Sequence, residues 1–153
     1  MKVRDLDGLA QYKGWYEADF LPEPPATVVT TINENGVLYD VNVENGQKTG
    51  FFLDQKYNRV AAACLAAGKR VLDCFTHTGA FALNAAMGGA LSVRAVDISA
   101  EAVRQTEANI CKNGLSEVVT VEEANVFDVL TELTEKKKKD YDFIILDPPA
   151  FAK

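Results

Sequence analysis

The chain has 153 residues, of which 48% are hydrophobic and 25% are charged, and its formal net charge is −6. This length can bury one hydrophobic core, and the composition is ordinary for a soluble globular protein. No apolar run approaches the roughly 18 residues of a membrane span. The N-terminus also lacks a signal-peptide pattern, so we expect a cytoplasmic protein without a membrane partner. The acidic balance argues against a strongly basic nucleic-acid surface on this chain.

Metal binding is not expected. The sequence has three cysteines, Cys64, Cys74 and Cys111, and a single histidine, His77. The cysteines show no C-x-x-C spacing, which excludes the usual zinc and disulfide frameworks. We therefore interpret all three thiols as small buried hydrophobic groups.

Residues 1–50 are predicted to form an N-terminal segment with a β-hairpin. Two β-patterned runs, 27–32 and 37–43, are joined by Asn35-Gly36, and an Asn-Gly pair between alternating apolar segments is a strong hairpin signal. The alternation places one set of side chains on a single face: Val37, Tyr39, Val41 and Val43.

Residues 51–153 are predicted to form an α/β domain, because helical and strand patterns alternate along them. The predicted helices are 54–67, 80–87, 100–112 and 126–135, and the predicted strands are 70–74, 91–96, 118–122 and 141–146. Such alternation gives a Rossmann-like, doubly wound parallel sheet with right-handed crossovers. The chain stops shortly after the fourth predicted strand, so we expect it to be a longer domain cut short.

Acidic residues follow three of the predicted strands. Asp73, Asp97 and Asp147 each come at or just after a strand end, and a short turn through Gly79 follows Asp73. In open α/β sheets the ligand lies outside the carboxyl ends of the strands. The three carboxylates therefore predict a ligand site along one edge of the sheet.

Asp97 and the single glycine in the turn after Asp73 indicate which ligand binds at this edge. Asp97 closes the second predicted strand, about 20 residues after the glycine turn, and such an acid can accept both ribose hydroxyls of an adenosine ligand. A nicotinamide or flavin dinucleotide is the alternative, but it requires a G-x-G-x-x-G turn, and the turn here contains one glycine. S-adenosylmethionine needs no diphosphate cradle and fits this pattern. Asp73 would face its positive methionine end, directly or through water, while Gly79 would make room for the backbone.

The loop Asp147-Pro148-Pro149-Ala150-Phe151 follows the last predicted strand. Two prolines stiffen the loop, and an aromatic ring beyond them can stack on a planar base. We therefore predict catalytic roles for Asp147 and Phe151, while a rigid turn with Phe151 in the core is the alternative. Methylases of exocyclic amines typically carry the aromatic residue directly after Pro-Pro, whereas Ala150 intervenes here.

Three separated motifs together resemble the bacterial large-subunit ribosomal RNA methyltransferase I type: GQKTGFFLDQ at 46–55, VLDCFTHTGAF at 71–81 and DPPAFA at 147–152. This resemblance implies a class I S-adenosylmethionine-dependent enzyme that methylates carbon 5 of a cytosine in large-subunit ribosomal RNA. It also implies that residues 49–55 form a lid strand over the cofactor and that the turn 124–127 flanks the adenine. The predicted cofactor-binding residues are Thr49, Gly50, Phe52, Asp54, Gln55, Asp73, Phe75, Thr76, Gly79, Ala80, Phe81, Asp97, Ile98, Ser99, Asn125, Val126 and Asp147.

Methylation of cytosine carbon 5 requires a cysteine thiolate that adds to carbon 6. In the resembling family this cysteine lies on a later strand, and an RNA-binding PUA domain precedes the chain. We therefore expect this chain to be the cofactor-binding part of the enzyme, inactive alone, with RNA bound mainly by other regions. Two alternatives remain: a methyltransferase of a guanine or adenine nitrogen, and a non-catalytic module that binds an adenosine ligand or RNA.

Overall fold

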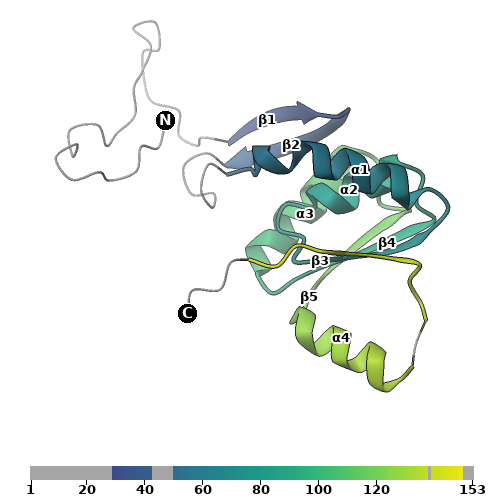
Figure 1. The fold of residues 1–153 in the computed structure, drawn as a ribbon. Coiled ribbons are helices and arrows are strands. Elements are labelled where there is room, and N and C mark those ends of the chain that lie inside the picture. Colours follow the sequence, from purple (N-terminus) through teal and green to yellow (C-terminus); the bar gives the residue numbers. More distant parts are fainter. Residues whose placement is uncertain (1–28, 43–49, 138, 150–153) are drawn as a thin grey trace, which may run out of the picture. The chain divides into compact units, whose positions relative to one another are not determined.

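The computed structural model describes residues 29–42, 50–137 and 139–149 (Figure 1). The contacts divide the chain into two units, residues 1–30 with 41–52 and residues 31–40 with 53–153. We call the second of these the α/β unit. The predicted boundary after residue 50 stays a prediction. In the described ranges, no helix has the length and apolar character needed to cross a membrane.

The predicted hairpin is present as β1 (Val29–Glu34) and β2 (Val37–Asn42). Its turn residues Asn35 and Gly36 have φ angles of 56° and 83°. Positive φ at both positions is what a two-residue type I′ turn requires, and Asn-Gly tolerates it. The side chains at 37, 39 and 41 are buried, as the alternation predicted. β1 continues to Glu34, two residues beyond the predicted end.

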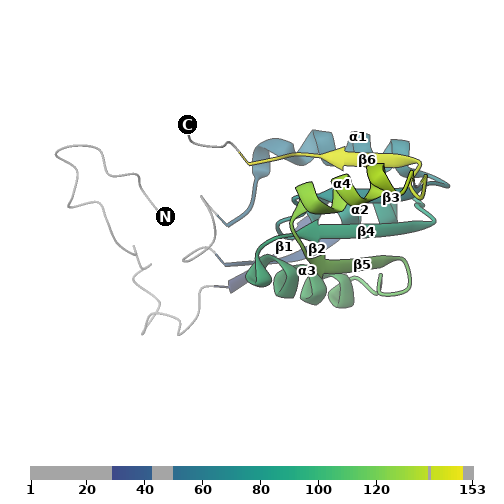
Figure 2. The same ribbon diagram turned by 90° about the horizontal axis from the view of Figure 1, so that it is seen from below.

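In the described part of the α/β unit, four parallel strands form one sheet in the order β5-β4-β3-β6 (Figure 2). The strands are β3 (Arg70–Cys74), β4 (Ser92–Asp97), β5 (Val119–Glu123) and β6 (Phe143–Leu146). The chain steps from β3 through β4 to β5 and then returns to the other side of β3. In open α/β sheets, ligands bind outside the carboxyl ends of the strands where the order reverses in this way.

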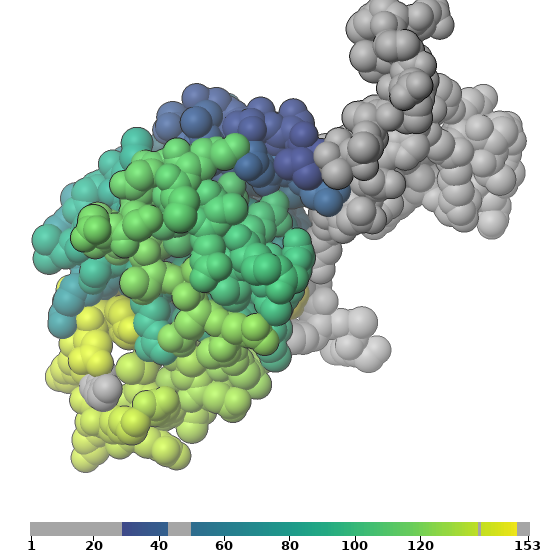
Figure 3. All heavy atoms as spheres, turned by 180° about the vertical axis from the view of Figure 1, so that it is seen from behind, coloured from purple at the N-terminus to yellow at the C-terminus, as the bar shows by residue number. Residues whose placement is uncertain are grey.

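Helices cover both faces of this sheet. They are α1 (Lys56–Ala66), α2 (Ala80–Met87), α3 (Ala100–Lys112) and α4 (Val126–Glu135), and the 3-10 turn η2 (Leu53–Gln55) precedes α1. Right-handed crossovers in one direction place α2 and α3 on the same face, and the reversed crossover places α4 on the other. Figure 1 shows α1 and α2 above the strands and α4 below them. Seen from behind, green atoms of α3 and the segment after it form much of the surface, with yellow-green atoms of α4 below (Figure 3).

The predicted α/β fold with a parallel sheet and a separate hairpin is thus confirmed. The helices at 80–87, 100–112 and 126–135 have the predicted bounds. Two elements are shorter than predicted: the helix expected over 54–67 begins as η2 and becomes α-helical at Lys56, and the last strand begins at Phe143 rather than at residue 141.

One hydrophobic cluster lies between the sheet and α4. It contains Leu72 and Cys74 of β3, Val96 of β4, and Val126 and Val129 of α4. Cys74 is buried as predicted, but Cys64 and Cys111 are exposed, so the interpretation of all three thiols as core residues is wrong for these two. Both lie on outer helix faces, which the sequence spacing did not reveal.

Candidate functional site at the carboxyl edge of the sheet

Asp73 lies beneath the turn that joins β3 to α2. Its carboxylate accepts hydrogen bonds from the Thr76 hydroxyl at 2.6 Å and from the backbone N–H of Ala82 at 3.0 Å, and its side chain is 1% exposed. Burial raises the pKa of Asp73 to about 7, and the charges of Asp147 and Asp97 add to the increase. Asp73 therefore ties the turn to the start of α2. Its predicted role toward a cationic ligand stays a prediction.

The turn itself has an unusual backbone. Phe75, His77 and Gly79 all have positive φ, at 61°, 55° and 77°. Hydrogen bonds to β4 hold this conformation, because Thr76 N–H donates to the Val96 carbonyl at 3.0 Å and His77 N–H donates to Asp97 at 2.9 Å. Strained backbone of this kind persists only where its surroundings determine it.

α3 packs so closely against the turn that a residue with a side chain at position 79 would collide with it. A Cβ atom at this position would lie 2.7 Å from Cγ2 of Thr106 and 3.3 Å from Cδ1 of Leu83. The space that the missing side chain leaves is thus filled by the protein. We predicted that Gly79 makes room for a ligand, and that role stays untested beside this packing role.

Asp97 has a half-buried carboxylate that organises two loops. One oxygen accepts the N–H of His77 at 2.9 Å, and the other accepts the N–H of Ser99 at 3.0 Å. Ser99 is the N-cap of α3, as predicted, and its hydroxyl accepts the N–H of Ala102. Ile98, between them, is 67% exposed.

The turn after β5 lies beside Asp97, because Ala124 N–H donates to the Asp97 carbonyl at 2.9 Å. Asn125 is the N-cap of α4 and accepts the N–H of Phe127 at 3.0 Å, whereas Val126 is buried in the core. The Phe127 ring is 54% exposed and meets the Phe75 ring edge-on, with centroids 5.8 Å apart. Phe127 belongs to the turn 124–127 that the family resemblance placed beside the adenine, and its contact with a cofactor stays a prediction.

Other predicted residues lie at the start of α2, after β6, or outside the described residues. Ala80 begins α2 and its carbonyl accepts the Asn84 amide at 2.8 Å, while Phe81 is half-buried. Asp147 is exposed directly after β6, the neighbour of β3. Phe151 and Thr49 lie outside the described residues.

The predicted lid residues Gly50 and Phe52 are described, with Gly50 at a φ of 83°. A Cβ at Gly50 would meet the Asn42 carbonyl, so the chain passes close to the end of β2 there. Asp54 and Gln55 lie in η2, where Gln55 accepts the Asn58 amide at 2.6 Å. Contact of these four residues with a cofactor stays a prediction.

Two polar residues of α3 were missed. Thr106 and Asn109 are fully buried, and they donate to the consecutive carbonyls of His77 and Thr78, each at 3.0 Å. The signal for them is their position on the buried face of α3, beside Ala102 and Ile110. Buried polar side chains need a partner, and the backbone of the turn provides it.

None of the cysteines offers a nucleophile at this edge. Cys74 is nearest, but its side chain is 1% exposed and burial raises the pKa of its thiol to about 11. Among the described residues, no group of three or more acidic, histidine or cysteine side chains could hold a metal ion. The apolar cavity of about 190 Å³ between α4 and β6 contains none of the predicted site residues; it is lined by Leu130, Leu133, Thr134, Tyr141 and Ile144.

The groups at this edge fit a nucleoside better than a diphosphate. Each oxygen of Asp97 accepts one N–H, and a carboxylate offers about four lone-pair positions, so acceptor capacity remains for hydroxyl groups. Ile98 and Phe127 present apolar surface to solvent nearby. The Asp97 carboxylate would repel a pyrophosphate.

Comparison with known proteins decides between the adenosine ligands. A family model described as S-adenosylmethionine-dependent methyltransferase matches residues 4–153. The chain belongs to this methyltransferase family. The predicted S-adenosylmethionine-dependent methyltransferase family and its cofactor are therefore confirmed.

Curated relatives of this methyltransferase chain include proteins named ribosomal RNA large subunit methyltransferase I. The protein from Shewanella amazonensis is 47% identical over 150 residues, which cover 97% of this chain and 36% of that protein. The protein from Photobacterium profundum is 43% identical over 151 residues, covering 98% of this chain and 36% of that protein. The chain thus spans little more than a third of the length of these relatives.

Solved structures agree with the family. A protein from Streptococcus mutans described as an S-adenosylmethionine-dependent methyltransferase is 36% identical, with a TM-score of 0.74 over 84% of this chain and 35% of its own. A methyltransferase solved with S-adenosylhomocysteine is 37% identical, with a TM-score of 0.73 over 87% of this chain and 35% of its own. An Agrobacterium tumefaciens methyltransferase, 23% identical with a TM-score of 0.76 over 86% of this chain and 43% of its own, supports the fold alone.

Proposed function

We propose that the protein methylates large-subunit ribosomal RNA and that this chain holds its S-adenosylmethionine at the carboxyl ends of β3 and β4. The observation that carries the proposal is the half-buried Asp97 carboxylate, organised by two backbone N–H groups beside exposed apolar side chains. The RNA substrate is supported by the names of relatives that are 41–47% identical to this chain.

The proposed roles follow from the placement of the side chains. Asp97 accepts the ribose hydroxyls, and Ile98 and Phe127 flank the adenine. Asp73, held under the turn, keeps the backbone of Phe75 to Gly79 in place. When bound, S-adenosylmethionine supplies an electrophilic methyl group on a positive sulfonium, and a negative potential at this edge favours that charge.

We further propose that the methylated atom is carbon 5 of a cytosine. This chemistry needs an accessible thiolate. Cys74 is buried with a raised thiol pKa, and Cys64 and Cys111 lie in helices away from the strand ends. The nucleophile must therefore come from outside these 153 residues. Asp147 lies directly after β6 and begins the loop to which we assign contact with the target base.

Cofactor binding is tested by calorimetric titration of the chain with S-adenosylhomocysteine. Asp97→Ala should weaken binding about 10- to 150-fold, the loss expected for charge-assisted hydrogen bonds to the ribose. Glu101→Ala is the matched control, because it removes one acid from the first turn of α3 without touching the turn after β3. It should change the affinity less than about 2-fold, as a surface charge does. No binding by the folded wild-type chain, or equal affinity in all three proteins, would overturn the proposed site.

The substrate is tested with the protein purified from its natural host. Methyl-labelled S-adenosylmethionine and unmethylated large-subunit RNA should give labelled 5-methylcytidine after digestion to nucleosides. A labelled purine would overturn the proposal of carbon 5, and label that enters only DNA or small molecules would overturn the proposal of ribosomal RNA.

A further inference from the structure

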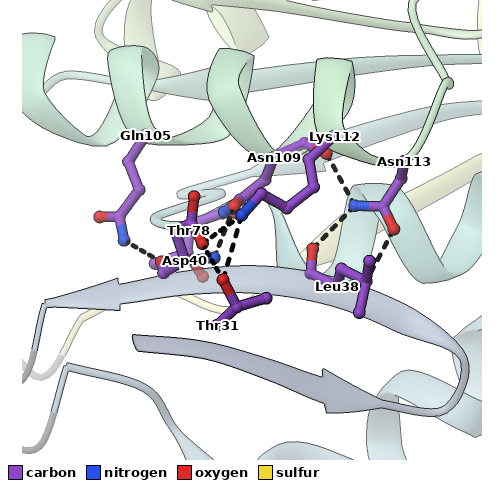
Figure 4. A network of polar contacts seen from close by, with 8 residues as sticks. All are labelled: Thr31, Leu38, Asp40, Thr78, Gln105, Asn109, Lys112 and Asn113. Carbon is purple, nitrogen blue, oxygen red and sulfur yellow. Dashed lines mark hydrogen bonds and ion pairs between the residues drawn. The ribbon is translucent and has the colours of Figure 1, made fainter. Parts of the chain in front are cut away.

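Three amide side chains, two in α3 and one at its C-cap, form a ladder along the hairpin strand β2. Asn113 accepts the Leu38 N–H at 2.9 Å and donates to the Leu38 carbonyl at 2.7 Å. Asn109 accepts the Asp40 N–H at 2.9 Å, and Gln105 donates to the Asp40 carbonyl at 2.7 Å (Figure 4). Residues four apart lie on one face of a helix, which is why these three amides follow the same strand. They bind the backbone of β2 much as a neighbouring strand would.

Charged and hydroxyl groups reinforce the same contact. The Lys112 amine pairs with the Asp40 carboxylate and donates to the Thr31 hydroxyl at 3.1 Å, and that hydroxyl donates to Asp40 at 2.6 Å. In Figure 4 these side chains converge between α3 and the hairpin. The residues 31–40 of the hairpin and α3 are thereby held in one register.

Among the hydrogen bonds of the described residues, Asn109 is the one ladder amide that also contacts the turn after β3. Its side chain is fully buried, and its amide nitrogen donates to the Thr78 carbonyl at 3.0 Å. Figure 4 shows Thr78 beside Asn109 and Asp40. One amide therefore bonds the hairpin backbone with its oxygen and the turn backbone with its nitrogen.

The turn that Asn109 holds leads directly to Asp97. His77, which precedes Thr78, donates its N–H to the Asp97 carboxylate at 2.9 Å. His77 also has a positive φ of 55°, which is uncommon for any residue other than glycine, although histidine adopts it more often than most. The contacts to β4 and α3 must therefore supply the energy that keeps this turn in shape.

We propose that Asn109 is a positioning residue for the cofactor site, which couples the hairpin strand β2 to the turn that orients Asp97. The inference rests on the proposed binding of S-adenosylmethionine at this edge. Without the Asn109 amide nitrogen, the Thr78 carbonyl loses its partner, the turn relaxes, and the Asp97 carboxylate loses part of its orientation for the ribose.

Asn109→Asp tests this role, because aspartate keeps the oxygen that accepts Asp40 N–H but lacks the donor to Thr78. Asn113→Asp is the matched control: it makes the same change one helical turn away and removes the donor to the Leu38 and Asn109 carbonyls, not a donor to the turn. The affinity for S-adenosylhomocysteine is measured by calorimetry, the stability by urea denaturation, and the protection of the amides of residues 77–79 by hydrogen exchange without ligand.

Asn109→Asp should weaken binding at least about 5-fold, as expected for a lost buried hydrogen bond, and should speed hydrogen exchange at residues 77–79. Asn113→Asp should lower the stability and leave affinity and exchange within about 2-fold of the wild type, the change expected of a group without contact to the site. Equal affinity losses in both variants, or none in Asn109→Asp, would overturn the inference.

The failure of cofactor binding and the failure of the positioning role give different results. Wild-type chain that binds no S-adenosylhomocysteine would refute the proposed function, whereas wild-type binding with an unchanged Asn109→Asp variant would refute only the positioning role. If Asn109→Asp does not fold, the pair Asn109→Ser and Asn113→Ser replaces it, because the shorter serine hydroxyl cannot bond both the hairpin and the turn. The same difference in affinity is expected of that pair, and its absence would overturn the inference.

Discussion

Glu34 and Arg59 form a bidentate ion pair in the interior of the α/β unit. Arg59 Nε donates to Glu34 Oε1 at 2.6 Å, Nη2 donates to Oε2 at 3.0 Å, and the side chains are 2% and 6% exposed for Arg59 and Glu34. The pair joins the end of β1 to α1, two elements far apart in sequence. An ion pair removed from water in this way is costly to break on one side only.

Arg59→Met should therefore lower the free energy of unfolding by about 3–5 kcal/mol, because it leaves the Glu34 carboxylate buried without its ion-pair partner. The double variant Glu34→Leu with Arg59→Met should recover part of this loss, since no buried charge then remains at the pair. Urea denaturation of the wild type, both single variants and the double variant measures the coupling. A double variant less stable than Arg59→Met would contradict this account.

Stability should depend on pH through Asp73. Burial raises the pKa of its carboxyl from 3.8 to about 7, so the folded chain holds this proton more tightly than the unfolded chain does. The stabilising contribution is present below about pH 4 and is lost as the pH rises toward 7. Asp73→Asn, which keeps an oxygen acceptor for Thr76 and Ala82, should lack this loss. Urea denaturation at several pH values compares the two proteins; parallel curves would refute the raised pKa.

The comparison with Asp73→Asn is needed because another group titrates nearby. Burial lowers the pKa of His77, so its contribution to stability grows with pH and opposes that of Asp73. The difference between wild type and variant isolates the carboxyl group, since His77 is present in both.

Gly79→Ala should lower the free energy of unfolding by about 2–4 kcal/mol, from positive φ and overpacking together. The new Cβ would lie 2.7 Å from Cγ2 of Thr106. Gly114→Ala is the control, because Gly114 also has positive φ but has no atom within 4 Å of the added Cβ. It should lose only about 1–2 kcal/mol. Adding Thr106→Ser, which removes Cγ2, should restore part of the stability of Gly79→Ala, as thermal or urea unfolding will show.

Thiol labelling should distinguish the cysteines. Cys64 and Cys111 are exposed, whereas Cys74 is buried and burial raises its thiol pKa to about 11. A thiol reagent at pH 7–8 should therefore modify two groups in the folded chain and the third only after denaturation, because thiolates are the reactive form. Mass spectrometry of labelled peptides identifies the sites. Rapid labelling of Cys74 in the folded chain would show that it is accessible and would reopen its role as a nucleophile.

The sequence by itself determined the elements and the edge at which the ligand site is proposed. Local signals were sufficient there: the Asn35-Gly36 pair specified the hairpin turn, Ser99 capped α3, and acids at the strand ends marked the carboxyl edge. Alternating helices and strands imply a parallel sheet, and connection handedness then leaves few topologies. A predicted boundary differed where an element starts gradually, as in η2 before α1.

Only the tertiary structure decided what the polar groups contact. Asp73, predicted to face a ligand, holds the turn from below, and the space beside Gly79 is taken by Thr106 of α3. Asn109 bonds Asp40 and Thr78, which are 69 and 31 residues away along the chain. No sequence window contains such partners, because a buried polar group is satisfied by whichever backbone the fold brings within hydrogen-bond distance. The roles of Asp73, Gly79 and Asn109 therefore follow from the packing of β2, the turn after β3 and α3.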